Sequence, residues 1–143
     1  MNDKIGLKIR MLDNLIQKNI CRLVSQKGAS EITYMNFWII NYIHECSPRA
    51  VYQKDIEQTL AINRATASKM LTTMEKKGLI SREVSEEDGR MRKIVLRPDA
   101  LLYYDQHKEV VEELEHMITK GLTQEDIKSF FKVYDVMKRN LDI

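Results

Sequence analysis

The sequence predicts a mainly α-helical fold of six helices with one small β-hairpin. Three observations indicate this. Only five glycines and two prolines occur among the 143 residues, so long helices are permitted almost throughout. Apolar residues recur at helical spacing in long stretches near both ends of the chain. Two segments rich in β-branched residues, 79–84 and 91–96, flank Asp88-Gly89, which is a hairpin signal.

The first part of the chain predicts two helices of different character. Apolar residues at helical spacing span residues 4–25, and QKGAS at residues 26–30 breaks the pattern. A second helix is expected to begin at Thr33, whose hydroxyl can cap the first turn, and to end before Pro48. Because this second segment is apolar on nearly all sides, we expect it to lie at the centre of the core.

The middle of the chain predicts two helices joined by a tight turn, directly before the hairpin. Residues 53–60 form the first helix and residues 61–63 the turn. Asn63 is suited to cap the next helix, which we expect to run to Lys77 and to end at a left-handed Gly78.

Two further helices are expected after the hairpin. Pro98 fits the first turn of a helix, where its missing N–H is harmless, and this helix should extend to about Lys120. Gly121 ends it, and Thr123 can cap a final helix. The order is then four helices, a hairpin and two helices.

The division of the chain follows from this order. The long apolar helices at the two ends exceed what the central module needs, so we expect two chains to pair through them. We therefore expect N-terminal core and dimerisation helices in residues 1–47, a central lobe in residues 48–98, and C-terminal dimerisation helices in residues 99–143.

The composition is that of a folded chain with a basic middle and an acidic tail. Hydrophobic residues make up 43% and charged residues 31% of the chain, which argues against disorder. Net charge is +3 over residues 1–52 (seven Lys or Arg against four Asp or Glu), +3 over residues 53–98 (ten against seven) and −4 over residues 99–143 (six against ten). This division suggests that one region meets a polyanion and another does not.

Neither a membrane span nor a signal peptide is expected. The longest mainly apolar run, NFWIINYI, falls far short of the about 20 residues that a span needs, and the N-terminus lacks an apolar core. Cys21 and Cys46 lie in separate predicted helices and are too few for a disulfide scaffold. We expect two buried, inert thiols and a reducing cytoplasm.

The helix after Asn63 has an outward face suited to a DNA groove. Its inward side is apolar and consists of Ala67, Met70, Leu71 and Met74. The outward side is short or basic, with no carboxylate before Glu75, and comprises Arg64, Ala65, Thr66, Ser68, Lys69, Thr72, Thr73 and Lys76. A major groove about 12 Å wide admits a helix whose leading turns are slim and not negative. A solvated helix face remains the alternative interpretation of this helix alone.

The hairpin tip EEDGRMRK adds a second candidate DNA contact. Asp88 stands two residues before Arg90, and Arg92 and Lys93 follow. A carboxylate beside the arginine can hold its guanidinium in one orientation, ready for the negative potential of a narrow minor groove. The two glutamates before Asp88 count against a simple basic patch, and a solvated turn is the alternative. A slim helix followed directly by an arginine-tipped hairpin is more specific than either part.

These segments together carry a family resemblance. The stretch YQKDIEQTLAINRATASKMLTTMEKKGLISREVSEEDGRMRKIVLRPDA resembles the winged helix-turn-helix of MarR-type transcriptional regulators, through its D-G-R wing, the basic strand that follows, and L-x-P-x-A at the start of the next helix. The six-helix plan extends the resemblance over nearly the whole chain. The expected fold class is therefore a mainly α winged helix-turn-helix with a dimerisation region built from both chain ends.

The resemblance implies a sequence-specific regulator, of repressor type, that acts as a homodimer on a pseudo-palindromic double-stranded DNA operator. Recognition helices would enter successive major grooves, and the wings adjacent minor grooves. The expected DNA-binding residues are Gln53, Asn63, Arg64, Thr66, Ser68, Lys69, Thr73, Asp88, Arg90, Arg92 and Lys93. Arg97-Pro98 departs from the Leu-Thr of many members, a difference that concerns the start of the next helix more than DNA contact.

The resemblance also implies a sensory input, commonly a small phenolic or other anionic effector, an oxidant or zinc. No cofactor and no metal site is predicted here. His44 and Cys46 are two residues apart on one helix and point roughly 200° apart, and His107 and His116 are also poorly spaced.

Two alternatives concern how the chain would be regulated. Cys21 lies in the helix where peroxide-sensing relatives carry their reactive cysteine, so a cysteine-based redox regulator stays open. Tyr34, Met35 and Trp38 could line an effector pocket, although their pattern indicates core first.

Two other function classes remain to be weighed. A winged helix can serve as a protein-interaction module, which an apolar exposed helix would favour over this hydroxyl-rich, basic one. An enzyme is not expected, because the sequence has no nucleophile elbow, phosphate-binding glycine loop or clustered histidine–carboxylate set.

Overall fold

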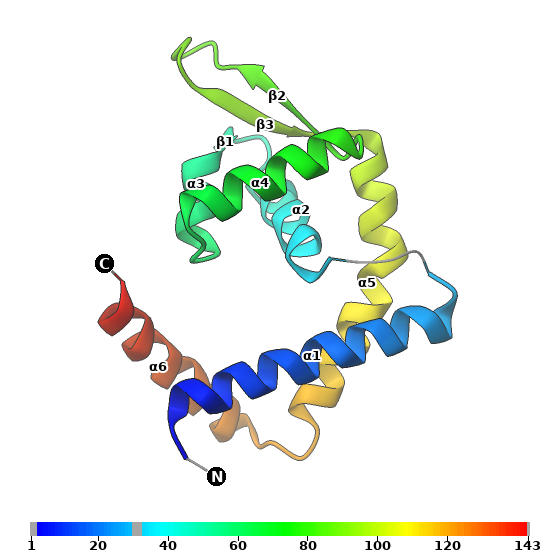
Figure 1. Ribbon diagram of the computed structural model, residues 1–143, viewed down its shortest axis with the longest axis vertical. Helices are drawn as coiled ribbons and strands as arrows, with labels where there is room; N and C mark the ends of the chain where they lie inside the picture. The colour runs from blue at the N-terminus through cyan, green and yellow to red at the C-terminus, as the bar shows by residue number, and fades with distance from the viewer. Residues whose placement is uncertain (1–2, 30–32, 143) are drawn as a thin grey trace.

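The structure, a computed structural model, describes residues 3–29 and 33–142. Its elements, in chain order, are α1 (Ile5–Lys27), α2 (Tyr34–Cys46), β1 (Val51–Tyr52), α3 (Gln53–Thr59), α4 (Arg64–Lys76), β2 (Ile80–Val84), β3 (Arg92–Leu96), α5 (Pro98–Thr119) and α6 (Gln124–Leu141) (Figure 1). The predicted helices and hairpin strands are confirmed. Strand β1 was not predicted, because two residues are too few to show a strand period.

The molecule is elongated, with the hairpin at one end and two terminal helices at the other. Figure 1 shows α4 lying beneath the β2–β3 hairpin, and α1 and α6 at the opposite end of the long axis. Helix α5 runs between the two ends and contacts α1, α2 and β3. The central lobe and the chain ends are thus separate in space, joined mainly along α5.

The sheet ties the hairpin to the helices of the lobe. Its strand order is β1-β3-β2, with both pairs antiparallel. Ile94 of β3 pairs with Val51 on one side and Arg82 on the other. Because Val51, Ile80 and Ile94 are buried, the base of the hairpin is part of the core while its tip extends into solvent.

Helix α4 forms where its local signals predict. The Asn63 side-chain carbonyl accepts from the Thr66 amide at 2.8 Å, which satisfies one of the free donors of the first turn. At the other end Gly78 has φ +76°, the left-handed conformation that glycine adopts without strain.

Two clusters of buried side chains hold the chain together. The larger one joins α2, α3, α4, the sheet and the start of α5, and is made of Ile39, Ile40, Ile43, Val51, Ile56, Leu71, Met74, Leu79, Ile80, Ile94 and Ala100. The smaller one lies where α1 crosses α5 and is made of Ile20, Leu23, Val110 and Leu114. The expected central position of α2 is confirmed, since its middle residues belong to the larger cluster.

The start of α2 differs from the expectation. Thr33 occupies the cap position, but its hydroxyl makes no capping hydrogen bond, so the prediction of a hydroxyl cap is wrong. Instead the Thr33 backbone amide donates to the Tyr103 hydroxyl of α5 at 3.1 Å. A tertiary contact, rather than a local one, positions the beginning of this helix.

The helices at the chain ends leave a large apolar surface without a partner. Helix α6 has no buried residue, and the N-terminal half of α1 is exposed. We call this surface the terminal-helix face; its large exposed apolar residues are Ile5, Ile9, Leu12 and Leu15 of α1 and Phe130, Phe131, Val133, Tyr134, Val136 and Leu141 of α6. Within the described chain no helix is long and apolar enough to cross a membrane.

The cysteines do not match the expectation of two buried thiols. Cys21 is exposed and Cys46 is half-buried, so the prediction is wrong for Cys21. Only one side of α1 packs on α5, through Ile20 and Leu23, and Cys21 is not on that side.

Replacing Gly78 with alanine should lower the free energy of unfolding by about 1 kcal/mol or more, because the left-handed conformation is strained for a residue with a Cβ. Space is not the problem, since the nearest atom to a Cβ there is Asp99 Oδ2 at 3.9 Å. Gly89→Ala is the matched control, because Gly89 has neither a left-handed φ nor a neighbour within 4 Å. Urea denaturation measures both; an equal effect of the two substitutions would contradict the explanation.

Candidate nucleic-acid interface

Helix α4 presents its polar side to solvent as predicted. Ala67, Leu71 and Met74 are fully buried, which fixes the rotation of the helix about its axis. The exposed residues along the other side are Arg64, Ala65, Thr66, Lys69, Thr72, Thr73 and Lys76, and Ser68 is half-buried at the edge. Side chains that are short or basic thus line the exposed face up to Glu75.

Two of the expected DNA-binding residues also have structural partners at the start of α4. Asn63 is exposed and caps the helix through its side-chain carbonyl. Gln53 is half-buried, and its Nε2 donates to Glu57 Oε2 at 3.2 Å and to the Arg64 carbonyl at 3.4 Å. Gln53 therefore links α3 to the first residue of the exposed helix.

Arg82 of β2 connects the hairpin to α4. Its Nη2 donates to the Thr72 hydroxyl at 3.2 Å and to the Ser68 carbonyl at 3.4 Å. Its Nε is buried and has no hydrogen-bond partner. The guanidinium is thus held against the helix even though one of its donors is unsatisfied, and this contact sets the position of the hairpin relative to α4.

Sequence reasoning missed Arg82, because nothing in the local pattern of a strand residue shows that it reaches a helix 10 and 14 residues earlier in the chain. The alternation of side chains along β2 was the only available signal. It indicates which residues share a face, but it does not identify what that face contacts.

The tip of the hairpin is an ordered turn. Asp88 Oδ1 accepts from the Arg90 backbone amide at 2.9 Å, and the Met91 amide donates to the Asp88 carbonyl at 3.0 Å. The prediction that Asp88 holds the Arg90 guanidinium is therefore not what the structure shows, since this carboxylate binds the backbone of Arg90. An aspartate two residues before a backbone N–H closes a local turn more readily than it reaches a long side chain.

The base of the turn is attached to the body through Ser85, which sequence reasoning also missed. Its hydroxyl is buried and lies 2.9 Å from the Tyr52 hydroxyl, and it accepts from the Glu87 amide at 3.2 Å. The turn that carries Arg90 is therefore linked to β1 as well as to β3.

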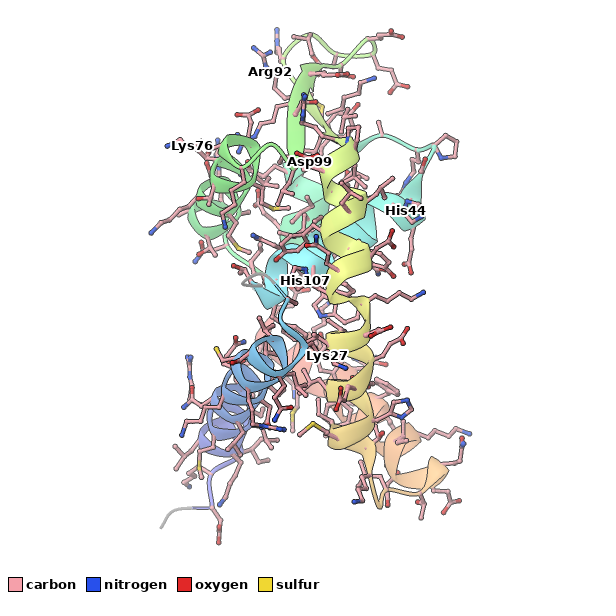
Figure 2. The ribbon with its side chains drawn as sticks, turned by 90° about the vertical axis from the view of Figure 1, so that its right-hand side faces the viewer. Lys27, His44, Lys76, Arg92, Asp99 and His107 are labelled. Atoms are coloured by element: carbon pink, nitrogen blue, oxygen red, sulfur yellow. The ribbon has the colours of Figure 1, made fainter. Side chains whose placement is uncertain are left out.

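The basic residues after the turn differ in their surroundings. Arg92 is exposed, and Figure 2 shows it at the hairpin end of the molecule. The same view shows the exposed Lys76 on α4. Lys93 is half-buried, and its Nζ lies 3.9 Å from Glu83 Oε2 on the paired strand. Arg92 is consequently freer than Lys93 to meet an external anion.

Comparison with known proteins agrees with this geometry. The MarR family model matches residues 30–91, a segment that contains α2, β1, α3, α4, β2 and the hairpin turn. The winged helix-turn-helix segment of the chain is thus similar to that of the MarR family. The family resemblance and the fold class predicted from the sequence are confirmed, and the family is one of transcriptional regulators.

Solved structures of the family share the fold over nearly the whole chain. The chain is similar to MepR of S. aureus in a DNA complex, with 21% identity and a TM-score of 0.82, covering 98% of this chain and 100% of that one. It is similar to the transcription regulator MarR of Oenococcus oeni PSU-1, with 23% identity and a TM-score of 0.75, covering 95% and 99%. It is also similar to the heme sensor PefR of Streptococcus agalactiae in complex with heme, with 22% identity and a TM-score of 0.65, covering 99% and 97%.

The candidate sensory residues are scattered over the fold. Across residues 3–29 and 33–142 no three His, Cys, Asp or Glu side chains are grouped to hold a metal ion. His44 is exposed, while His107 is fully buried in the middle of α5, with Nδ1 2.8 Å from the Tyr103 carbonyl (Figure 2). Cys46 Sγ accepts from Arg49 Nη2 at 3.1 Å.

The three residues considered for an effector pocket are half-buried rather than fully in the core. Trp38 packs edge-on against Phe37 and Tyr34, with ring centroids 5.2 and 6.0 Å apart. Met35 is half-buried on the same helix. Burial raises the pKa of the Tyr34 hydroxyl.

Thr72→Val should lower the free energy of unfolding by roughly 1 kcal/mol, because it removes an acceptor from a guanidinium that already has one buried donor unpaired. Thr66→Val is the matched control: the residue is exposed on the same helix, and the helix-propensity change is the same. In an Arg82→Met background the effect of Thr72→Val should disappear, since the donor is then absent. An effect of Thr72→Val that persists in that background would show that the Arg82 contact is not its cause.

Proposed function

We propose that the chain is a transcriptional regulator that acts as a homodimer on a pseudo-palindromic double-stranded DNA operator, and that it is a repressor. The proposal divides the chain into residues 1–47 and 99–143 for dimerisation and core, and residues 48–98 for DNA binding. The observation that carries it is the slim, uncharged or basic face of α4, which lies next to a hairpin bonded to that helix through Arg82.

The proposed contacts divide between two grooves. The major groove and its bordering phosphates are contacted by residues of α4, namely Arg64, Thr66, Ser68, Lys69 and Thr73, and by Gln53 and Asn63 at the N-terminal end of that helix. The adjacent minor groove is contacted by residues of the wing, namely Arg90, Arg92 and Lys93. Asp88 shapes the turn that carries them. Hydroxyls bind base edges or phosphates, while arginine can bind guanine through two hydrogen bonds. The structure of MepR in a DNA complex supports this use of the shared fold.

Exposed apolar surface supports the homodimer. Phe130, Phe131 and Leu141 of α6 are 61%, 58% and 76% exposed. Several large apolar side chains left exposed on one element mark an interaction surface in a soluble protein. Both components of the terminal-helix face come from the chain ends, so a second copy can bury them without touching α4.

The proposal includes a small aromatic or anionic effector that relieves DNA binding. It also places the protein in the cytoplasm. Similarity to a heme sensor in complex with heme supports a ligand-responsive role for the fold. Half-buried aromatic residues of α2 provide apolar surface of the kind that such pockets use.

The operator test is a fluorescence-anisotropy titration with DNA from upstream of the gene, against scrambled competitor, at several salt concentrations. We expect tight, salt-sensitive binding that scrambled DNA does not displace. Lys69→Ala should reduce the slope of log K against log salt by about one, because one phosphate contact is lost. Lys108→Ala, which removes an exposed lysine from the middle of α5, should leave the slope unchanged.

Equal, weak binding to operator and scrambled DNA would contradict specific recognition. That outcome would favour the alternative of a winged helix that binds a protein partner. An unchanged slope for Lys69→Ala, alongside specific binding by the wild type, would remove only Lys69 from the contacts.

The dimer test uses α6. Phe131→Glu should convert a dimer into a monomer in sedimentation equilibrium, because it places a charge in the apolar face. Lys132→Glu introduces the same side chain at the next position, where the wild-type residue is already charged and exposed, and should stay dimeric. A monomeric wild type, or a Phe131→Glu variant that remains dimeric, would contradict the proposed interface.

A further inference from the structure

Arg82 lies at the joint between α4 and the β2–β3 wing. Its strand contacts α4, and its Nη2 donates to the Thr72 hydroxyl and the Ser68 carbonyl of that helix. From this joint the helix and the hairpin diverge, so that the hairpin tip extends away from the lobe (Figure 1). Arg82 is therefore at the base of the angle between the two elements proposed to enter neighbouring grooves.

The Arg82 guanidinium carries a positive charge that the described protein does not neutralise. Across residues 3–29 and 33–142 it forms no ion pair with a carboxylate. Nη2 has two acceptors on α4, whereas the buried Nε has none and Nη1 makes no hydrogen bond within the described chain. Because a charged group with unused donors gains most from a charged acceptor, this position favours an external anion.

The Thr72 hydroxyl is the second donor at the joint. Its oxygen accepts from Arg82 Nη2 at 3.2 Å, and no described residue accepts its hydrogen. The neighbouring Thr73 differs, since its hydroxyl donates to the Lys69 carbonyl at 3.0 Å. Thr72 is also exposed, so its O–H can donate to a ligand that Arg82 binds at the same time.

The two faces of the hairpin differ in charge. Side chains two residues apart on a strand, and those directly opposed in an antiparallel pair, share a face. Arg82 and Val84 therefore share the face toward α4, and Arg92, which opposes Val84, lies on it too. Glu83 opposes Lys93 on the other face. The strand residues of the face toward α4 thus include two arginines and no carboxylate.

The adjoining side of α4 has the same character. Arg64, Ser68 and Thr72 are four residues apart, so they follow one side of the helix, and two of them bond to Arg82. The angle between helix and wing is consequently lined by basic and small polar groups. A helix in a major groove and a wing in the adjacent minor groove must straddle the sugar–phosphate backbone between these grooves, and the joint faces that backbone.

We propose that Arg82 and Thr72 together bind the DNA backbone phosphate that lies between the two grooves. The assignment of the anion to DNA rests on the proposed function. Arg82 Nη1 and the Thr72 hydroxyl are the donors, and the hydrogen bond between these side chains holds them in place before DNA binds. A phosphate contact carries no sequence information, but here it sets the register of α4 and the wing on the duplex together.

The test is an operator titration in which single phosphates of one half-site are replaced in turn by neutral methylphosphonates. At one phosphate between the grooves, the replacement should weaken wild-type binding by about tenfold, because a charge-assisted contact is lost. Arg82→Met should weaken binding to unmodified operator by a similar factor. At that same phosphate the replacement should cost Arg82→Met little more, since the two partners lose one shared interaction.

Two further variants separate phosphate contact from folding and from general charge. Arg97→Met removes an exposed arginine next to β3 and should keep the full wild-type loss at that phosphate. Thr72→Val should show a reduced loss there, whereas Thr72→Ser, which retains the hydroxyl, should match wild type. The Thr72 pair keeps the test decisive even when Arg82→Met folds poorly.

A purely structural role of Arg82 in holding the wing gives a different result. Arg82→Met would then weaken binding while remaining as sensitive as wild type to every methylphosphonate, and this outcome overturns the phosphate contact. Specific binding by wild type with no phosphate coupled to Arg82 or Thr72 also overturns it and leaves the proposed function standing. Binding by wild type that does not distinguish operator from scrambled DNA overturns both.

Discussion

Burial of one side of α4 is the constraint on which the rest of the structure depends. Ala67, Leu71 and Met74 are fully buried, and a buried Leu or Met contributes roughly 1.5–3 kcal/mol. Turning the helix by a single residue, about 100°, would bring these side chains to the surface. The outward position of Thr66 and Lys69 is therefore determined by the buried residues on the opposite side of the helix.

The wing is positioned by a few weaker interactions on top of that core. Arg82 joins β2 to α4, the Ser85 hydroxyl joins the turn to β1, and Asp88 closes the tip. Each hydrogen bond contributes only about 1 kcal/mol. They keep Arg90 in one region of space, while the stability of the lobe comes from the buried strand residues Ile80 and Ile94.

At the opposite end, apolar packing rather than charge governs how the helices cross. Lys27 Nζ lies 3.0 Å from Glu113 Oε2, and the hydrogen bond and charge attraction between them raise the pKa of Lys27. Because the lysine is exposed, this ion pair contributes little to the stability of the fold. The crossing of α1 and α5 depends on Ile20, Leu23 and Leu114. Helix α6 has a capping box at Thr123 and Asp126 but buries no residue, although most of the stability of helices in proteins comes from packing an apolar face. This is the physical basis for assigning it to an interface with a second copy.

By itself the sequence determined the helices, the hairpin and the two faces of α4, because these depend on local spacing: apolar residues at helical periods, Asn63 at a cap, Gly78 at a left-handed end. The same locality explains the winged fold class and the choice of α4 and the wing as the candidate site. Tertiary structure alone decided the contacts between residues distant in sequence. It bonded the Thr33 backbone amide to the Tyr103 hydroxyl and the Arg82 guanidinium to the Thr72 hydroxyl. No local sequence pattern encodes these contacts, because each one forms only when two elements that are distant in sequence pack against each other.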